Sequence, residues 1–267
     1  MMETRETYTV GYSDVAVRYM RRRHASRDAG FLLPHLKPGM TVLDCGCGPG
    51  TITVGLAEAV APGQVIGVDL AESQLEAART TARQRGVKNV EWKVGSIYQL
   101  PFPDRSFDAV FSHALFEHLG EPLAALEEIK RVLRPGGIAA ISSPDWSGNL
   151  MAPRDPDVEQ AVQVYKAIQQ RNGGNPYVGR ELGCLLQEAG FSRISLSAIY
   201  DCYEDVPLVA ELLAQRIEEG VGKQIVAGPG LGRAEVGDLC RALRQWAKQP
   251  AVLFAQTFVD AIGYADA

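Results

Sequence analysis

Between residues 41 and 142 the chain alternates short apolar runs with longer amphipathic segments. This alternation is typical of βα units, in which right-handed crossovers join parallel strands into one sheet with helices on its faces. It predicts strands over residues 41–45, 65–68, 90–94, 109–112 and 138–142. Later patterns predict helices over 158–171, 180–189, 206–219 and 233–248, a sixth strand over 194–200 and a seventh over 251–259. The expected fold class is therefore α/β.

The chain length and the segments that break helices and strands indicate one domain with helical additions. A chain of 267 residues fits one large domain, since domains commonly run to about 100 to 200 residues. Breakers at 144–148 and 172–176 set off an insertion at about 145–177. We therefore divide the chain into an N-terminal helical lid (1–40), a core (41–200) that carries this insertion, a helical insertion (201–250), and the last strand and tail (251–267).

Charge and hydropathy exclude several classes of function. The chain has 27 Lys and Arg against 32 Asp and Glu, a formal net charge of −5, so no overall positive field favours a nucleic acid as partner. The basic cluster Arg21, Arg22 and Arg23 with Arg27 is interpreted as a solvated helix face. No uncharged stretch approaches the roughly 20 residues that span a bilayer, and we expect a cytoplasmic protein without a membrane span.

The cysteines predict neither a disulfide scaffold nor a metal site. Their number, five, is odd, and only Cys45 and Cys47 lie close together. No second Cys or His pair stands at the spacing that zinc requires. We expect reduced thiols and no bound metal.

A glycine-rich turn follows the first predicted strand, in the segment VLDCGCGPG at 42–50. Glycines tolerate positive φ and let a ligand approach main-chain N–H groups at the carboxyl edge of a parallel sheet. The second strand ends at Asp69, whose carboxylate can accept both hydroxyl protons of a ribose. A dinucleotide fingerprint needs glycine where this chain has Thr51. The two features together predict a ligand with one ribose, and they weaken a pyrophosphate site.

Ordered motifs extend this pattern along the chain. They are D-x-G-x-G-x-G at 44–50, the strand-terminal Asp69, Gly95-Ser96, LPF at 100–102, SFDAV at 106–110 and LRPGG at 133–137. The series resembles the class I S-adenosylmethionine-dependent methyltransferases, and most nearly the small-molecule branch that includes the ubiquinone and menaquinone biosynthesis C-methyltransferases. The resemblance covers about residues 35–200. It implies a Rossmann-like three-layer sandwich with helical lid insertions and a seven-stranded, mostly parallel sheet whose seventh strand is antiparallel.

The resemblance also implies S-adenosyl-L-methionine as cofactor, S-adenosyl-L-homocysteine as product and a small-molecule acceptor. Residue roles carry over to matching positions. Asp44, Gly46 and Gly48, with Cys47 between the glycines, would meet the methionine portion, Asp69 the ribose, Leu70 and Ile97 the adenine, and Gln74 the ribose or adenine side. Ser96 departs from the family's aspartate, and its uncharged hydroxyl should hold the adenine amine less strongly.

Two histidine positions raise the question of a general base. His113 follows the fourth predicted strand, so it should project at the edge that faces the methyl group. We predict it either as the base or as a residue that lines the cofactor site through its backbone. Glu117 and His118 come next and are interpreted as capping and packing groups.

The acceptor site should come from aromatic residues outside the core, because they suit a planar or apolar acceptor. The residues selected, with one acidic neighbour, are Tyr8, Tyr12, Tyr19, Asp145, Trp146, Tyr177, Tyr200 and Tyr203. The leucines of 208–213 and the apolar stripe of 239–246 are interpreted as packing. Two other functions stay open, an NAD(P)-dependent oxidoreductase and a non-catalytic S-adenosylmethionine-binding protein. Apolar positions on the C-terminal helices leave a homodimer open.

Overall fold

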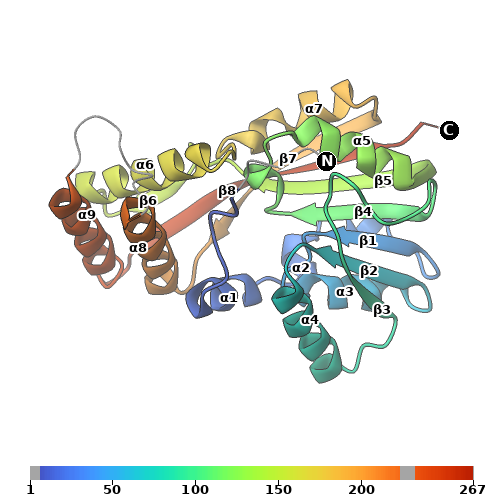
Figure 1. Cartoon of the computed structure of the whole chain (residues 1–267), viewed down its shortest axis with the longest axis horizontal. Helices are drawn as coiled ribbons and strands as arrows, with labels where there is room; N and C mark the ends of the chain where they lie inside the picture. The colour runs from blue at the N-terminus through green and yellow to red at the C-terminus, as the bar shows by residue number, and fades with distance from the viewer. Residues whose placement is uncertain (1–6, 223–231, 267) are drawn as a thin grey trace.

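One mixed β-sheet runs through the molecule (Figure 1). The computed structural model describes residues 7–222 and 232–266. Within them the strands are β1 (Thr41–Cys45), β2 (Gln64–Asp69), β3 (Val90–Val94), β4 (Phe107–His113), β5 (Leu133–Pro144), β6 (Leu150–Ala152), β7 (Ser192–Cys202) and β8 (Leu253–Tyr264). The sheet order is β3-β2-β1-β4-β5-β8-β6, with β7 also paired to β8. The strands β1 to β5 are parallel, and β8 is antiparallel to its neighbours.

The expected fold class is confirmed, with one strand more than predicted. The antiparallel last strand is β8, which runs to Tyr264, five residues beyond its expected end at 259. The additional strand, β6, pairs with Leu253–Ala255 of β8. It has three residues, too few for an alternating pattern to show in the sequence.

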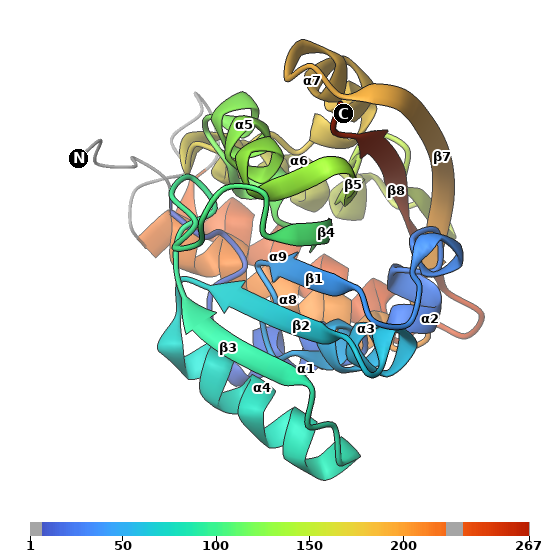
Figure 2. The same ribbon diagram turned by 90° about the vertical axis from the view of Figure 1, so that its right-hand side faces the viewer.

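Helices cover both faces of the sheet. Those described are α1 (Asp14–Arg21), α2 (Ala25–Asp28), α3 (Thr51–Val60), α4 (Glu72–Arg85), α5 (Pro122–Val132), α6 (Pro156–Arg171), α7 (Leu182–Glu188), α8 (Val206–Gly222) and α9 (Arg233–Trp246), with short 3-10 turns η1 (Leu33–His35), η2 (Phe116–His118) and η3 (Val178–Glu181). Figure 2 shows α3 and α4 on one side of the sheet and α5 and α7 on the other. Each face has its own buried apolar cluster, so the molecule has the predicted three layers.

A third apolar cluster lies beyond the ends of the parallel strands. The helices α1, α6, α8 and α9 build it, and we call them the helical cap. Its buried core includes Tyr19, Trp146, Tyr165, Leu213 and Trp246. The stripes of α8 and α9 therefore pack as predicted. Because the cap stands at the carboxyl ends of β4 and β5, it closes the edge of the sheet where ligands bind in open α/β folds.

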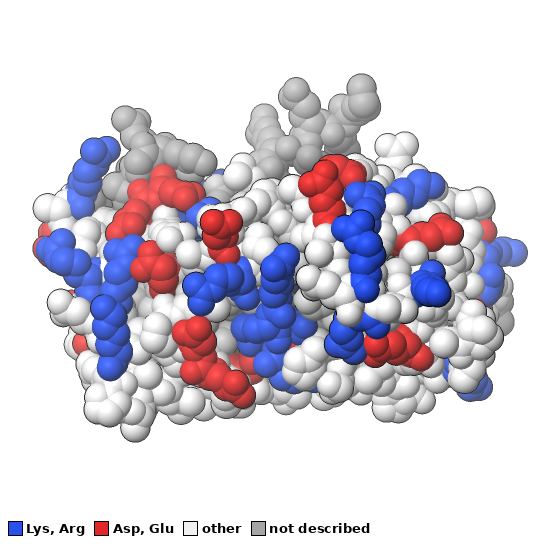
Figure 3. All heavy atoms as spheres, turned by 90° about the horizontal axis from the view of Figure 1, so that it is seen from below, with Lys and Arg blue, Asp and Glu red and all other residues white. Residues whose placement is uncertain are grey.

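The basic cluster near α1 is not the solvated face that the sequence suggested. Arg21 is exposed, but Arg22, Arg23 and Arg27 are half-buried. Arg22 pairs with Asp201 of β7, and Arg27 lies 3.5 Å from the same carboxylate. The interpretation was wrong because the end of α1 turns toward β7, a contact between segments far apart in the chain. Figure 3 shows basic and acidic side chains side by side on the face seen from below, without a field of one sign.

Candidate functional site

The glycine turn joins β1 to α3 and is tied to the end of β2. Gly46, Gly48 and Gly50 all have positive φ, at 73°, 51° and 74°. The backbone N–H groups of Gly46 and Cys47 donate to the carbonyl of Val68 at 2.8 and 3.0 Å. A Cβ at Gly50 would stand 2.6 Å from the Trp92 ring, whereas at Gly48 the nearest atom is 3.7 Å away. The turn is therefore packed on its inner side and open above Gly48.

Asp69 organises the other side of this turn. Its carboxylate accepts the N–H of Gly48 at 3.0 Å and the N–H of Ala71 at 2.9 Å. Burial raises the pKa of Asp69, and these backbone N–H groups partly offset the rise. Each carboxylate oxygen keeps a second lone pair for another donor. Asp69 can therefore accept ribose hydroxyls without giving up its hold on the turn.

The other residues predicted for the cofactor lie near the glycine turn and the end of β3. Leu70 is 70% exposed beside Asp69 and offers an apolar face to a flat ring. Gln74 is buried near Gly48, and its Oε1 has no hydrogen-bond partner in the described part of the chain. Ser96 is half-buried at the end of β3, where its Oγ accepts the N–H of Tyr98 at 3.2 Å, and Ile97 is buried next to it. These residues share the edge where β2 and β3 end.

Asp44 and Cys47 form the buried floor of the turn. Asp44 is 3% exposed and accepts the hydroxyl of Thr53 at 2.6 Å. Burial raises the pKa of Asp44 to about 7, against the opposing effect of the Thr53 hydrogen bond. Burial also raises the pKa of the Cys47 thiol. Near neutral pH the floor thus holds an uncharged thiol and a carboxyl that changes charge easily.

His113 lies at the end of β4, as expected, but packed among aromatic rings. It stacks on Phe258 with ring centroids 5.0 Å apart, and its Nε2 is 3.8 Å from Asp28 Oδ1. Burial and the nearby Arg23, with other arginines, lower the pKa of His113 well below its usual value. The imidazole is therefore neutral near pH 7. It is not among the residues that line the cavity described next.

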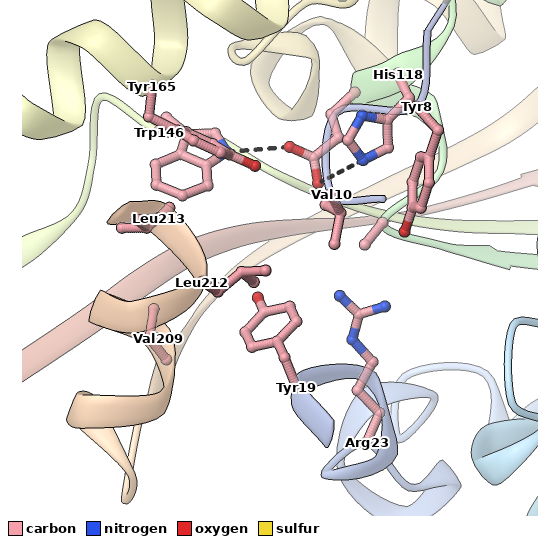
Figure 4. Close-up of a pocket in the computed structure, with 12 residues that line it drawn as sticks. Tyr8, Val10, Tyr19, Arg23, His118, Trp146, Tyr165, Val209, Leu212 and Leu213 are labelled. Atoms are coloured by element: carbon pink, nitrogen blue, oxygen red, sulfur yellow. Dashed lines mark hydrogen bonds and ion pairs between the residues drawn. The ribbon is translucent and has the colours of Figure 1, made fainter. Parts of the chain in front are cut away.

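A cavity of about 20 Å³ lies between the cap and the ends of β4 and β5 (Figure 4). Its polar and aromatic lining consists of Tyr8, Tyr19, Arg23, Glu117, His118, Trp146 and Tyr165. Apolar side chains of α8, including Leu212 and Leu213, close it. The two leucines therefore serve both packing and the cavity wall. Because Ala114 and Trp146, which follow β4 and β5, also line it, the cavity lies at the ligand-binding edge of the sheet.

A buried hydrogen-bond network holds one wall of this cavity. Glu117, on η2, is 6% exposed and accepts the indole N–H of Trp146 at 3.0 Å. The side-chain amide of Gln169 donates to the same oxygen at 2.7 Å. His118 Nε2 lies 3.7 Å from the other oxygen, and the His118 ring meets Tyr8 edge-on. The expected capping role of Glu117 and His118 is wrong, because α5 begins only at Pro122, whereas the expected packing role is confirmed.

The structure brings only part of the predicted acceptor site together. Tyr8, Tyr19 and Trp146 line the cavity. Tyr12 is 47% exposed beside Tyr8, Tyr200 is 52% exposed on β7, and Tyr177 lies against Lys166 outside the cavity. Arg23, Glu117, His118 and Tyr165 were not selected from the sequence. The adjacent pair Glu117 and His118 could have indicated this wall of the cavity from the sequence. The pair was instead interpreted as capping and packing groups.

Within residues 7–222 and 232–266, no group of His, Cys, Asp and Glu side chains is placed to hold a metal ion. In the same ranges no helix has the length and apolar composition to cross a membrane. The cysteines Cys45, Cys47, Cys184, Cys202 and Cys240 are all free thiols.

Comparison with known sequences identifies related proteins. A family model described as a methyltransferase domain matches residues 36–190. An uncharacterized methyltransferase of Schizosaccharomyces pombe is 34% identical over 221 residues, which cover 77% of this chain and 79% of that protein. The demethylmenaquinone methyltransferase of Geobacillus stearothermophilus is 39% identical over 105 residues, which cover 39% of this chain and 45% of that protein.

Solved structures agree with the sequence relatives. A SAM-dependent methyltransferase from Aquifex aeolicus is 27% identical, with a TM-score of 0.53 over 71% of this chain and 93% of that chain. The phosphoethanolamine N-methyltransferase 2 of Haemonchus contortus, solved with S-adenosyl-L-methionine, shares the fold with a TM-score of 0.58 at 19% identity, over 91% of this chain and 53% of that chain. The family model covers more than half of the chain, and its match includes the glycine turn and Asp69. The chain therefore belongs to the class I S-adenosylmethionine-dependent methyltransferases.

Proposed function

We propose that this enzyme transfers a methyl group from S-adenosyl-L-methionine to a small, flat and largely apolar acceptor held in the cavity. The observation that carries the proposal is the position of the cavity, which lies at the carboxyl ends of β4 and β5, on the same sheet edge as the glycine turn and Asp69. The names of the demethylmenaquinone methyltransferases support a small-molecule acceptor. The family assignment disfavours the oxidoreductase alternative.

In this proposal the chain's own residues bind and align. The cofactor supplies an activated methyl group on a sulfonium. Asp44 and the turn from Gly46 to Gly48 hold the methionine portion, and Asp69 holds the ribose. Leu70, Gln74, Ser96 and Ile97 surround the nucleoside at the ends of β2 and β3. Methyl transfer is an in-line displacement, so alignment of the acceptor atom and exclusion of water supply much of the rate.

The cavity must enlarge before it can hold an acceptor. About 20 Å³ is room for a single water molecule. Its outer wall belongs to α1 and α8, so we propose that these helices of the cap move outward to admit the acceptor and close again to exclude water. Equal protease sensitivity with and without ligands would contradict this movement.

The role of His113 as a general base stays a prediction. A low pKa makes its imidazole a weak base, and general-base catalysis requires hydrogen-bond reach to the acceptor's proton. Replacing His113 with Gln tests the role once an acceptor is known. Unimpaired transfer would remove it.

Ser96→Asp should tighten S-adenosylhomocysteine binding. A carboxylate in place of the hydroxyl forms a charge-assisted bond with the adenine amine, a gain of about 1 kcal/mol or about fivefold in Kd. Isothermal titration calorimetry measures the change, with Ser73→Asp, an exposed position on α4, as the control. Unchanged or weaker affinity would argue against adenine at this position.

Binding should also release protons from Asp44. Its pKa of about 7 leaves the carboxyl about half protonated near neutral pH. Because this pKa is raised in the folded state, protonated Asp44 favours folding, and the contribution is lost as pH rises from about 4 through about 7. The ligand's ammonium group lowers the pKa again, so binding at pH 7 should release about half a proton. Calorimetry in buffers of different ionisation enthalpy measures the release, and Asp44→Asn should abolish it.

The assignment has a direct test. Native mass spectrometry of the purified protein should find S-adenosylmethionine or S-adenosylhomocysteine at one per chain, and a screen with labelled methyl donor should then identify the acceptor. A protein that binds the cofactor but labels no acceptor would favour the non-catalytic alternative. Fluorescence enhancement of added NADH would favour the oxidoreductase instead.

Compartment and assembly belong to the same proposal. The five free thiols support a reducing compartment such as the cytoplasm.

The edge strand β7 supports a homodimer, because it exposes three large apolar side chains, Leu196, Ile199 and Tyr200, to 38–54%. Light scattering tests the oligomeric state. The net charge of −5 supports a partner other than nucleic acid.

A further inference from the structure

Arg23 is a cation in the cavity wall that forms no ion pair within the described residues. Two neighbouring arginines are neutralised, Arg22 by Asp201 and Arg27 by Asp28. Arg23 makes neither an ion pair nor a side-chain hydrogen bond within residues 7–222 and 232–266, and its buried Nε has no partner there. Its guanidinium carbon lies 5.3 Å from the centroid of the Tyr19 ring. Figure 4 shows the guanidinium directed into the cavity from the end of α1.

Among the described residues that line the cavity, no side chain forms an ion pair with Arg23. Glu117 lines the same space, but its carboxylate is held by Trp146 and Gln169 and lies beyond ion-pair distance of Arg23. Tyr8 also lines it, and burial raises the pKa of Tyr8 well above its usual value, so the phenol stays neutral. A half-buried cation without an ion-pair partner is costly, and a planar guanidinium suits an oxygen anion with two acceptor sites. The unpaired guanidinium of Arg23 therefore favours a ligand that brings an anionic oxygen.

We infer that Arg23 is the anion-binding residue of the cavity and selects a reactant that carries a carboxylate, phenolate or enolate oxygen. The inference rests on the proposed function and narrows its acceptor class. Two molecules of the reaction offer this chemistry, the acceptor and the methionine carboxylate of the cofactor. The position favours the acceptor, because Gly46, Gly48, Asp69 and Gln74 do not line the cavity. An anionic acceptor oxygen beside Arg23 would keep its charge in this closed site, with the apolar body against Leu212 and Leu213.

The test compares the wild type with Arg23→Met, which keeps length and removes charge, and with Arg23→Lys. Arg21→Met is the matched control, because Arg21 is exposed two residues away. The first probes are benzoate and its neutral isostere benzamide, titrated by ligand-observed NMR into the S-adenosylhomocysteine complex. We expect wild type to bind benzoate at least about tenfold more tightly than benzamide. Arg23→Met should lose this preference, whereas Arg23→Lys should keep part of it.

The second pair of probes separates the two sources of the anion. S-adenosylhomocysteine carries the methionine carboxylate, and 5′-methylthioadenosine lacks it. If Arg23 binds the acceptor, Arg23→Met leaves both affinities within about twofold. If Arg23 binds the cofactor, Arg23→Met should lower the affinity for S-adenosylhomocysteine about tenfold or more and leave the affinity for 5′-methylthioadenosine unchanged. That result would keep Arg23 as an anion-binding residue and assign the methionine carboxylate as its ligand. No preference for benzoate in wild type, together with unchanged S-adenosylhomocysteine affinity in Arg23→Met, would overturn the inference.

Stability gives an independent readout. Removing a half-buried charge that has no ion-pair partner should leave the melting temperature of the ligand-free Arg23→Met protein unchanged or raise it. A lower melting temperature would instead assign Arg23 a structural role and contradict the inference. Wild-type protein that fails to bind S-adenosylhomocysteine at all would refute the proposed methyltransferase function, a result distinct from either arm of the anion test.

Discussion

Replacing Asp69 with alanine is expected to weaken S-adenosylhomocysteine binding by a factor on the order of 10² to 10⁴. The proposed contact consists of two hydrogen bonds from ribose hydroxyls to one carboxylate, and bonds to charged groups contribute about 1.5 to 3 kcal/mol each. The same carboxylate accepts the N–H groups of Gly48 and Ala71, so its loss also loosens the turn. Calorimetric titration of S-adenosylhomocysteine measures the combined effect.

Two further variants separate charge from fold. Asp69→Asn keeps one acceptor oxygen and loses the charge, so its affinity should fall between that of wild type and that of the alanine variant. Glu72→Ala removes an exposed carboxylate three residues along the chain and should leave the affinity within about twofold. An Asp69→Ala protein that binds nearly as tightly as wild type would place the nucleoside elsewhere.

The cofactor side of the site could be predicted because its determinants are local. Gly46, Gly48 and Asp69 belong to one βαβ unit, and the parallel register pairs Cys45 with Val68, so the two strands end together. Any chain that forms this unit places the glycine turn beside the carboxylate. The pattern of apolar runs was therefore sufficient to predict that these residues lie together, without knowledge of the rest of the fold.

The acceptor side could not be predicted, because its residues come from separate parts of the chain. Arg23 follows α1, Glu117 lies on η2 and Tyr165 on α6, and long-range packing of the cap brings them to one cavity. Periodicity shows that a helix has an apolar stripe, but not which partner that stripe meets. Aromatic side chains were a poor guide for the same reason. Tyr19 reaches the cavity, whereas Tyr200 occupies an exposed position on an edge strand.

Glu117→Ala is expected to lower the free energy of unfolding by about 2 to 6 kcal/mol, because the Trp146 indole and the Gln169 amide would be left as buried donors at about 1 to 3 kcal/mol each. Glu117→Gln keeps an acceptor oxygen and should lose less. Chemical denaturation measures both variants. Glu127→Ala, which removes an exposed carboxylate on α5, serves as the control.

The Glu117 and Asp69 variants together test whether cavity and cofactor site are separate. Glu117 belongs to the wall between cap and sheet and has no contact with the glycine turn or Asp69 among the bonds of the described chain. A folded Glu117→Gln protein should therefore bind S-adenosylhomocysteine within about threefold of wild type while its labelled-methyl transfer falls, because a neutral acceptor holds the Trp146 indole less firmly and acceptor alignment suffers. Asp69→Ala should do the reverse, losing the cofactor with less effect on unfolding. If Glu117→Gln weakened cofactor binding as strongly as Asp69→Ala does, the two sites would be one, and the cavity would belong to the cofactor.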